Sequence, residues 1–295
     1  MPNRPLSALT SATLSLALVV GAASSAIADT NHARAALGYD LDVLVQQAAA
    51  SVCMINAGVD VRAEMIALGQ SRMAFIATLD QLSDAMGDHA LAQISVDWAP
   101  LDVATSMILV GDHPNTYKST VMQGLPPLQA AIQKFLSQSA QTDALSDDKT
   151  VSDMLTMDVA ARQALFVQQI KLQACELGSG TATASLVRDF TATTTSYDVT
   201  LTALRDGQPD VGINAPHSYQ VSQMLAAAMY DWQRVKPMLD VIAANGTATP
   251  EQLTKLRGLT DALQVRTSAL VDQYFLYGPD EAPMPQVALL LDGAE

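Results

Sequence analysis

The chain has 295 residues and a formal net charge of −14, from 16 basic and 30 acidic side chains. This charge argues against a nucleic-acid groove and against binding to an anionic membrane surface. Apolar residues make up 49% of the chain, whereas aromatic residues make up 5% and charged residues 16%. Such a composition favours helices that pack through small aliphatic side chains, so we expect an all-α fold.

The first 28 residues resemble a secretory signal peptide. Arg4 supplies a positive charge, residues 14–23 form a short apolar stretch, and Ala26-Ile27-Ala28 forms an A-x-A cleavage site. We expect cleavage after Ala28 and export to the periplasm; the alternative is an uncleaved anchor. Later apolar runs are shorter than the ~18 residues of a membrane span. We therefore expect no transmembrane segment in the mature chain.

The first half of the mature chain contains four helical patterns. A helix over 29–57 has an apolar face spaced by three and four residues, comprising Val45, Ala48, Val52 and Ile55. A second helix, over 60–86, is expected to turn five apolar residues inward, namely Met65, Leu68, Met73, Ile76 and Leu79. The third, over 89–110, should kink or restart at Pro100, and the fourth, ending near 143, should be interrupted or begin anew at Pro126-Pro127.

The second half repeats this pattern. A shift of 122 residues (175 − 53) aligns Cys53 with Cys175 and Phe75 with Tyr197, and a shift of 134 (232 − 98) aligns Trp98 with Trp232. The difference of 12 (134 − 122) falls in the Gly- and Pro-rich stretch 207–217, where insertions are tolerated. We therefore expect two superposable four-helix-bundle-like units related by pseudo-symmetry, over 29–145 and 146–277, followed by a tail over 278–295.

Residues 160–169, AARQALFVQQ, followed by a Cys and a Gly-bounded turn, resemble the first-helix signature of the PilJ-type domain, whose pattern is roughly AGRQRMLSQR. This domain is the periplasmic sensor module of type IV pilus chemotaxis transducers. The resemblance implies a helical ligand-sensing module related to nitrate-sensing domains. Arg162, Gln163 and Gln168 match the pattern, whereas Ala164 and Gln169 stand where it has Arg. In the first copy only Gln46 matches.

The candidate ligand-binding residues are therefore Arg162, Gln163, Gln168, Gln169, Gln46 and Gln47. Arg162 is suited to anchor a carboxylate or oxyanion, although the alternative is a surface Arg paired with a nearby Asp. The glutamines offer paired donors and acceptors for a polar pocket between the two first helices, or they merely flank an apolar stripe. We expect Trp98 and Trp232 to wedge between helices in the core.

Cys53 and Cys175 occupy equivalent positions of the two copies. An exported chain with an even number of cysteines resides in an oxidising compartment, so these two residues are candidates for a disulfide. The bridge requires the copies to pack about an axis that passes close to both cysteines, with Cα atoms within ~7 Å. The alternative is two separate buried thiols, one in each core.

The four histidines are scattered without metal-ligand spacing, and no phosphate-loop, nucleophile-elbow or dinucleotide motif occurs, so we expect neither metal nor cofactor nor enzymatic activity. Two functions remain. The first is a periplasmic small-molecule sensing module that passes its ligand state to a membrane receptor, transporter or envelope complex. The second is a structural or adaptor protein of the cell envelope that has lost the ligand site.

Overall fold

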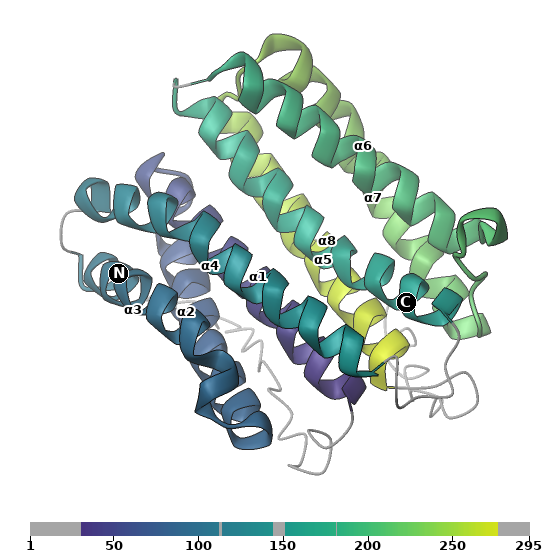
Figure 1. Ribbon diagram of the computed structural model, residues 1–295. Helices are drawn as coiled ribbons and strands as arrows, with labels where there is room; N and C mark the ends of the chain where they lie inside the picture. The colour runs from purple at the N-terminus through teal and green to yellow at the C-terminus, as the bar shows by residue number, and fades with distance from the viewer. Residues whose placement is uncertain (1–30, 112–113, 144–150, 181, 277–295) are drawn as a thin grey trace, which may run out of the picture.

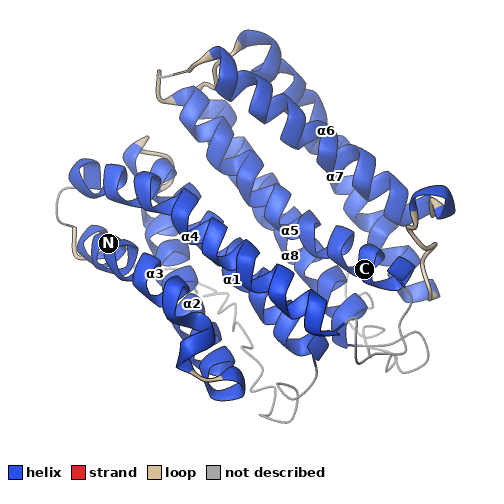
Figure 2. Cartoon of the chain, in the orientation of Figure 1, coloured by secondary structure: helices blue, strands red, loops and turns tan. Residues whose placement is uncertain are grey.

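The computed structural model describes residues 31–111, 114–143, 151–180 and 182–276. Across these ranges the chain forms eight α-helices, one short 3₁₀ turn and no strand, which confirms the all-α fold class (Figure 2). The helices are α1 (Asn31–Asn56), α2 (Val61–Met86), α3 (Asp88–Leu109), α4 (Pro114–Asp143), α5 (Val151–Gly178), α6 (Ala184–Asp206), α7 (Tyr219–Asn245) and α8 (Pro250–Leu276). The proposed signal peptide and the tail after 277 lie outside the described residues.

The helices fall into two sets of four consecutive helices, and each helix contacts at least two others of its own set. In the first set α1 contacts α2 and α4, while α3 lies against both α2 and α4. In the second set α5 contacts α6 and α8, while α7 lies against both α6 and α8. Helix α1 joins the sets because it also packs against α5 and α8 (Figure 1). The two first helices, α1 and α5, therefore form the centre of the molecule.

Aromatic side chains at equivalent positions are in contact in both sets. Phe75 of α2 stacks on Trp98 of α3 with ring centroids 4.0 Å apart, and Tyr197 of α6 packs on Trp232 of α7 at 4.5 Å. Both tryptophans are buried, as a role in the core requires. The indole N–H of Trp232 also donates to Asp198 over 2.7 Å. The shifts of 122 and 134 residues thus bring together the same pair of ring types in each half.

The inserted stretch forms a loop that docks on the start of α5. Gly207 ends α6 with a φ of 74°, a left-handed conformation that favours glycine. Ser152 donates to the carbonyl of Gly212 over 2.8 Å, and Asn214 donates to Asp153 over 2.7 Å. These bonds fix the loop to the opening turn of α5.

Two sequence expectations about the helices are wrong, one on α4 and one on α2. Helix α4 continues through Pro126 and Pro127 without the expected interruption, and α3 continues through Pro100 without restarting there. Each proline forfeits one backbone hydrogen bond, but tertiary packing supplies most of the stability of a long helix. In α2, Met73 faces solvent with 61% of its surface exposed, because Leu68, Phe75 and Leu82 form the buried face instead.

Candidate functional site

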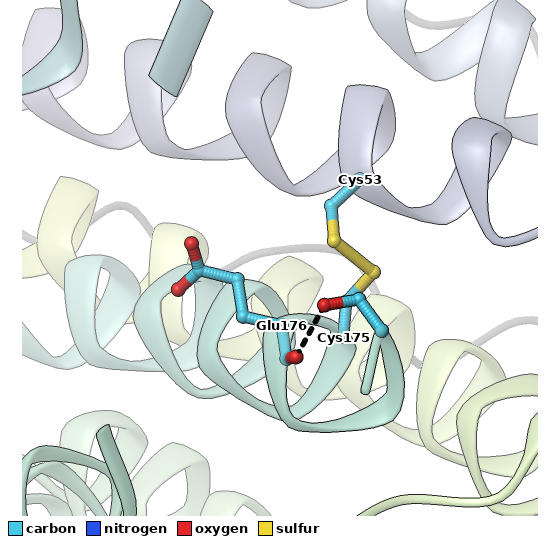
Figure 3. Close-up of a disulfide and its surroundings, with 4 residues drawn as sticks. Cys53, Cys175 and Glu176 are labelled. Atoms are coloured by element: carbon cyan, nitrogen blue, oxygen red, sulfur yellow. Dashed lines mark hydrogen bonds between the residues drawn. A yellow bond between two sulfur atoms is a disulfide. The ribbon is translucent and has the colours of Figure 1, made fainter. Parts of the chain in front are cut away.

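Helices α1 and α5 run side by side in parallel. Near their starts the hydroxyl of Tyr39 on α1 donates to the carboxylate of Asp158 on α5. Near their ends Cys53 and Cys175 form a disulfide with Cα atoms 6.1 Å apart (Figure 3). Tyr39 precedes Cys53 on α1, and Asp158 precedes Cys175 on α5. The two contacts therefore occur in the same order along both helices, so the helices run parallel. Of the two arrangements left open by the sequence, the structure therefore shows the bridge.

On each of the two helices, the row of side chains that leads to the disulfide follows a heptad pattern. Counting back from each cysteine in steps of four and three residues gives the side chains that lie on the same face. We call this surface the α1–α5 seam. It comprises Tyr39, Asp42, Gln46, Ala49 and Cys53 of α1, and Ala161, Ala164, Gln168, Lys171 and Cys175 of α5. All of these residues except Tyr39 are buried.

Gln46 and Gln168 lie at equivalent positions of the seam, each seven residues, or about two helical turns, before its cysteine. They are 3% and 2% exposed, and the side-chain oxygen Oε1 of each is buried without a hydrogen-bond partner in the described part of the chain. A buried acceptor without a partner costs roughly 1–3 kcal/mol. Other buried oxygens, such as Oε1 of Gln163 and Gln173, also lack a partner in the described part of the chain; Gln46 and Gln168 are distinguished as the same residue type at equivalent positions of the two halves.

The other residues predicted for the site are not brought together there. Arg162 is exposed and its guanidinium pairs with Asp158, four residues earlier on α5, over 2.9 Å. Gln163 is buried but turns towards α6, where it donates to the hydroxyl of Thr200 over 2.8 Å. Gln47 and Gln169 each follow a seam glutamine and are half-buried on another side of their helix. The structure therefore assigns Gln46 and Gln168 alone to the seam.

Asp42 is the acidic member of the seam and is held by the first half. Its carboxylate accepts hydrogen bonds from the side chains of Gln133, at 2.6 Å, and Gln129, at 3.3 Å, both on α4. Burial raises the pKa of Asp42, while the two glutamine donors and the charge of Arg162 act in the opposite direction. Asp42 thus has its own partners and is not a free group for a ligand.

Lys171, the basic member of the seam, belongs to an ion cluster that connects the two halves. Its ammonium lies 2.9 Å from the carboxylate of Glu64 on α2 and 3.4 Å from that of Asp261 on α8. Arg257 of α8 contacts the same Glu64 oxygen at 3.0 Å and Asp60 at 2.6 Å. Glu64 and Lys171 are fully buried. Together with the disulfide, this cluster fixes α2 and α1 to α5 and α8.

This cluster was not predicted from the sequence. Two signals were present: Lys171 lies between Ile170 and Leu172, four residues before Cys175, and Glu64 begins the buried row that continues with Leu68 and Phe75. Both charged residues therefore lie on apolar faces. The partners within the cluster were not predictable from local sequence. For example, the ion pairs of Arg257 with Glu64 and with Asp60 span 193 and 197 residues.

The chemistry available at the seam is hydrogen bonding by two amides rather than recognition of an anion by a free cation. Arg162, Lys171 and Arg257 each have a carboxylate partner. A shallow depression lies elsewhere, on the outer face of α6, beside Val187, Arg188 and Thr191. Among the described residues no group of three or more His, Cys, Asp or Glu side chains is arranged to hold a metal ion.

Within the described ranges, none of the helices is both long and apolar enough to cross a membrane. Comparison of the chain with protein-family models, with curated protein sequences and with solved structures gave no match.

Proposed function

We propose that the protein is an exported, non-enzymatic binding module that senses a small molecule at the middle of the α1–α5 seam. One observation supports this proposal above the others: the Oε1 atoms of Gln46 and Gln168, equivalent in the two halves, are buried and have no partner in the described chain. A ligand that donates hydrogen bonds to both oxygens would remove the cost of leaving them unpaired.

The paired charges around the seam limit the class of ligand. Because Arg162 is already bound to Asp158, a free oxyanion such as nitrate finds no unpaired arginine at this position. The side-chain amide of glutamine carries both an acceptor oxygen and a donor nitrogen. We therefore propose a small ligand with N–H or O–H donors, such as an amino acid, an amide or a polyol, in place of the anion that the family resemblance implies.

A ligand in the seam would touch α1 and α5 at once, and hence both halves of the chain. Its binding would change how tightly the halves meet, and that change is a signal that a partner protein can read. We propose a membrane receptor, a transporter or another envelope complex as that partner. The type IV pilus chemotaxis role implied by the resemblance is one form of this proposal.

Thermal denaturation in the presence of candidate ligands tests the proposal. The panel comprises amino acids, amides, polyols, dicarboxylates, nitrate and nitrite. A ligand present at 100 times its Kd should stabilise the protein by about 2.7 kcal/mol. The Gln46→Leu/Gln168→Leu variant should lose this shift, whereas the matched Gln47→Leu/Gln169→Leu variant, altered one residue along each helix, should keep it. A shift that survives loss of both seam glutamines would remove the seam from the site.

A second candidate function is a structural adaptor of the cell envelope. The observation that favours it is the ion cluster of Glu64, Lys171 and Arg257, which together with the disulfide holds the two halves in one arrangement. A fixed scaffold needs such links, whereas a sensor needs some freedom between its halves. No thermal shift across the whole panel, combined with recovery of a defined envelope protein after in vivo crosslinking, would favour the adaptor.

A further inference from the structure

The outer face of the α2–α3 hairpin exposes apolar side chains that the fold leaves uncovered. On α2 these include Ile66 and Met73, which are 54% and 61% exposed. On α3 they are Val96 and Val103, and at the C-cap of α3 Val110; these are 65%, 59% and 77% exposed. Single exposed apolar residues are ordinary, but several on two neighbouring helices indicate an interaction surface. We call this surface the hairpin face.

The exposed residues recur at the heptad spacing of helix–helix contacts. Val96, Val103 and Val110 follow one another at seven-residue intervals, as do Ile66 and Met73. Between the two residues of α2 lies Gly69, and Ile76 follows three residues after Met73. Steps of four and three residues along both helices are the pattern of a seam that receives another helix. The buried faces of α2 and α3 account for a different set of residues.

The two rows lie on the same side of the hairpin. Arg72 of α2 and Asp102 of α3 form an ion pair of 2.7 Å across the groove between the helices. Met73 and Val103 are the next residues along the chain from these two. Phe75 and Trp98, which stack at 4.0 Å, lie on the opposite, core side of the groove. Met73 and Val103 therefore both point outward, beside each other.

The charges at the ends of the α2 row indicate what covers this face. Arg62 precedes Ile66 by four residues and Asp80 follows Ile76 by four, so the row begins with a positive residue and ends with a negative one. Both side chains belong to exposed residues, and neither makes an ion pair within the described part of the chain. A helix row with opposite charges at its two ends is complementary to itself in the antiparallel direction.

We infer that a second copy of this chain docks on the hairpin face, with the two α2 helices antiparallel about a twofold axis. In this register Arg62 lies beside Asp80 of the second copy, and Ile66 beside Ile76 of the second copy. Gly69 lies beside Met73 of the second copy. A Cβ built at Gly69 meets only Leu109, at 3.8 Å, so the glycine leaves space for the methionine side chain. The valines of α3 widen the apolar contact on one flank of each α2.

Sedimentation velocity of the mature exported chain tests this inference. The unaltered protein should sediment as a dimer at a chain concentration of about 0.1 mM. Met73→Glu should raise the dissociation constant of the dimer at least about tenfold. Far-UV circular dichroism and the thermal midpoint of Met73→Glu should match those of the unaltered monomer, because the side chain is exposed in the single chain. Val103→Glu is a second variant with the same expectation. Val265→Glu, 70% exposed on α8, is the matched control and should leave the dimer intact.

Charge reversal tests the register. Arg62→Asp places two carboxylates together at both symmetric ends and should weaken the dimer by about tenfold. Asp80→Arg should do the same with two cations. The double variant Arg62→Asp/Asp80→Arg should restore the affinity, because the opposite charges then face each other again in reversed order. A monomeric unaltered protein, a dimer indifferent to Met73→Glu, or failure of the double variant to restore the dimer would overturn the inference.

Discussion

The ammonium of Lys171 on α5 lies 2.9 Å from the carboxylate of Glu64 on α2, and both side chains are withdrawn from water. This pair joins the two halves of the chain about one helical turn before the disulfide, because Lys171 lies four residues before Cys175 on α5. Arg257 adds a second cation to the same carboxylate oxygen at 3.0 Å, while the other oxygen of Glu64 has no partner within the described chain. Removing either charge of such a pair leaves the other buried without a counter-ion, which strongly destabilises the folded protein.

We predict that removing the carboxylate at position 64 destabilises the protein more than any exposed ion pair can. Glu64→Leu leaves the Lys171 ammonium buried without its main counter-ion and should lower the free energy of unfolding by about 3–5 kcal/mol. Glu64→Leu/Lys171→Met should recover part of this loss. The control is Asp240→Leu, which breaks the exposed Lys236–Asp240 pair and should cost less than about 1 kcal/mol. Urea denaturation measures all three; equal losses at positions 64 and 240 would contradict a buried role.

We predict that the protein contains no free thiol. Cys53 and Cys175 close a loop with a sequence separation of 122. Cys53→Ala/Cys175→Ala should lower the free energy of unfolding by roughly 2–4 kcal/mol, by freeing the unfolded chain in the entropic account. Thiol titration of the protein, denatured without reductant, checks the bridge directly. Two free thiols per chain would show that the bridge is absent.

The equivalent glycines Gly124 and Gly258 are predicted to respond in opposite directions to alanine. A Cβ at Gly124 on α4 would come within 2.2 Å of Leu101 Cδ1 on α3, whereas one at Gly258 on α8 meets nothing within 4 Å. Gly124→Ala should therefore destabilise by about 1–3 kcal/mol, because Leu101 must move. Gly258→Ala should stabilise by about 0.5–1 kcal/mol through helix propensity. Thermal or urea denaturation gives both values, and a stabilising Gly124→Ala would refute the close packing of α3 on α4.

The stability of the protein should depend on pH through Asp42. Burial raises the pKa of this carboxyl in the folded state above its unfolded value of about 3.9, so between the two values the folded chain binds more protons. Stability due to Asp42 is thus greatest at low pH and is lost as the pH rises through the folded pKa. Subtracting the free energy of unfolding of the unaltered protein from that of Asp42→Asn should give a difference that increases between pH 4 and pH 7.

Asp240→Asn, in an exposed ion pair, is the control for that series. Asp240 lies on the surface next to Lys236, so the corresponding difference should stay small across the same range. Chemical denaturation at intervals of about one pH unit follows both variants against the unaltered protein. A flat difference for Asp42→Asn would mean that the carboxyl titrates in the folded chain as it does in the unfolded one.

The sequence by itself determined the features that depend on local pattern. Helix periodicity and composition predicted an all-α chain, and the boundaries predicted for α2 and α3 agree with the structure within one residue. The aligned pairs Phe75 with Tyr197 and Trp98 with Trp232 also became equivalent contacts. Such features follow from the spacing of side chains along one helix and from similarity between two segments, both of which are visible in the letters alone.

The tertiary structure decided which faces meet and which charges find partners. Gln46 and Gln168 share the seam while Arg162 does not, because the register of α1 against α5 selects one face of each helix. Met73, expected in the core, lies outside because the buried row of α2 runs through Leu68 and Phe75, and periodicity does not distinguish two neighbouring apolar rows. The Glu64–Arg257 contact spans 193 residues. A partner that distant is set by how helices pack in space, and no local pattern in the chain encodes it.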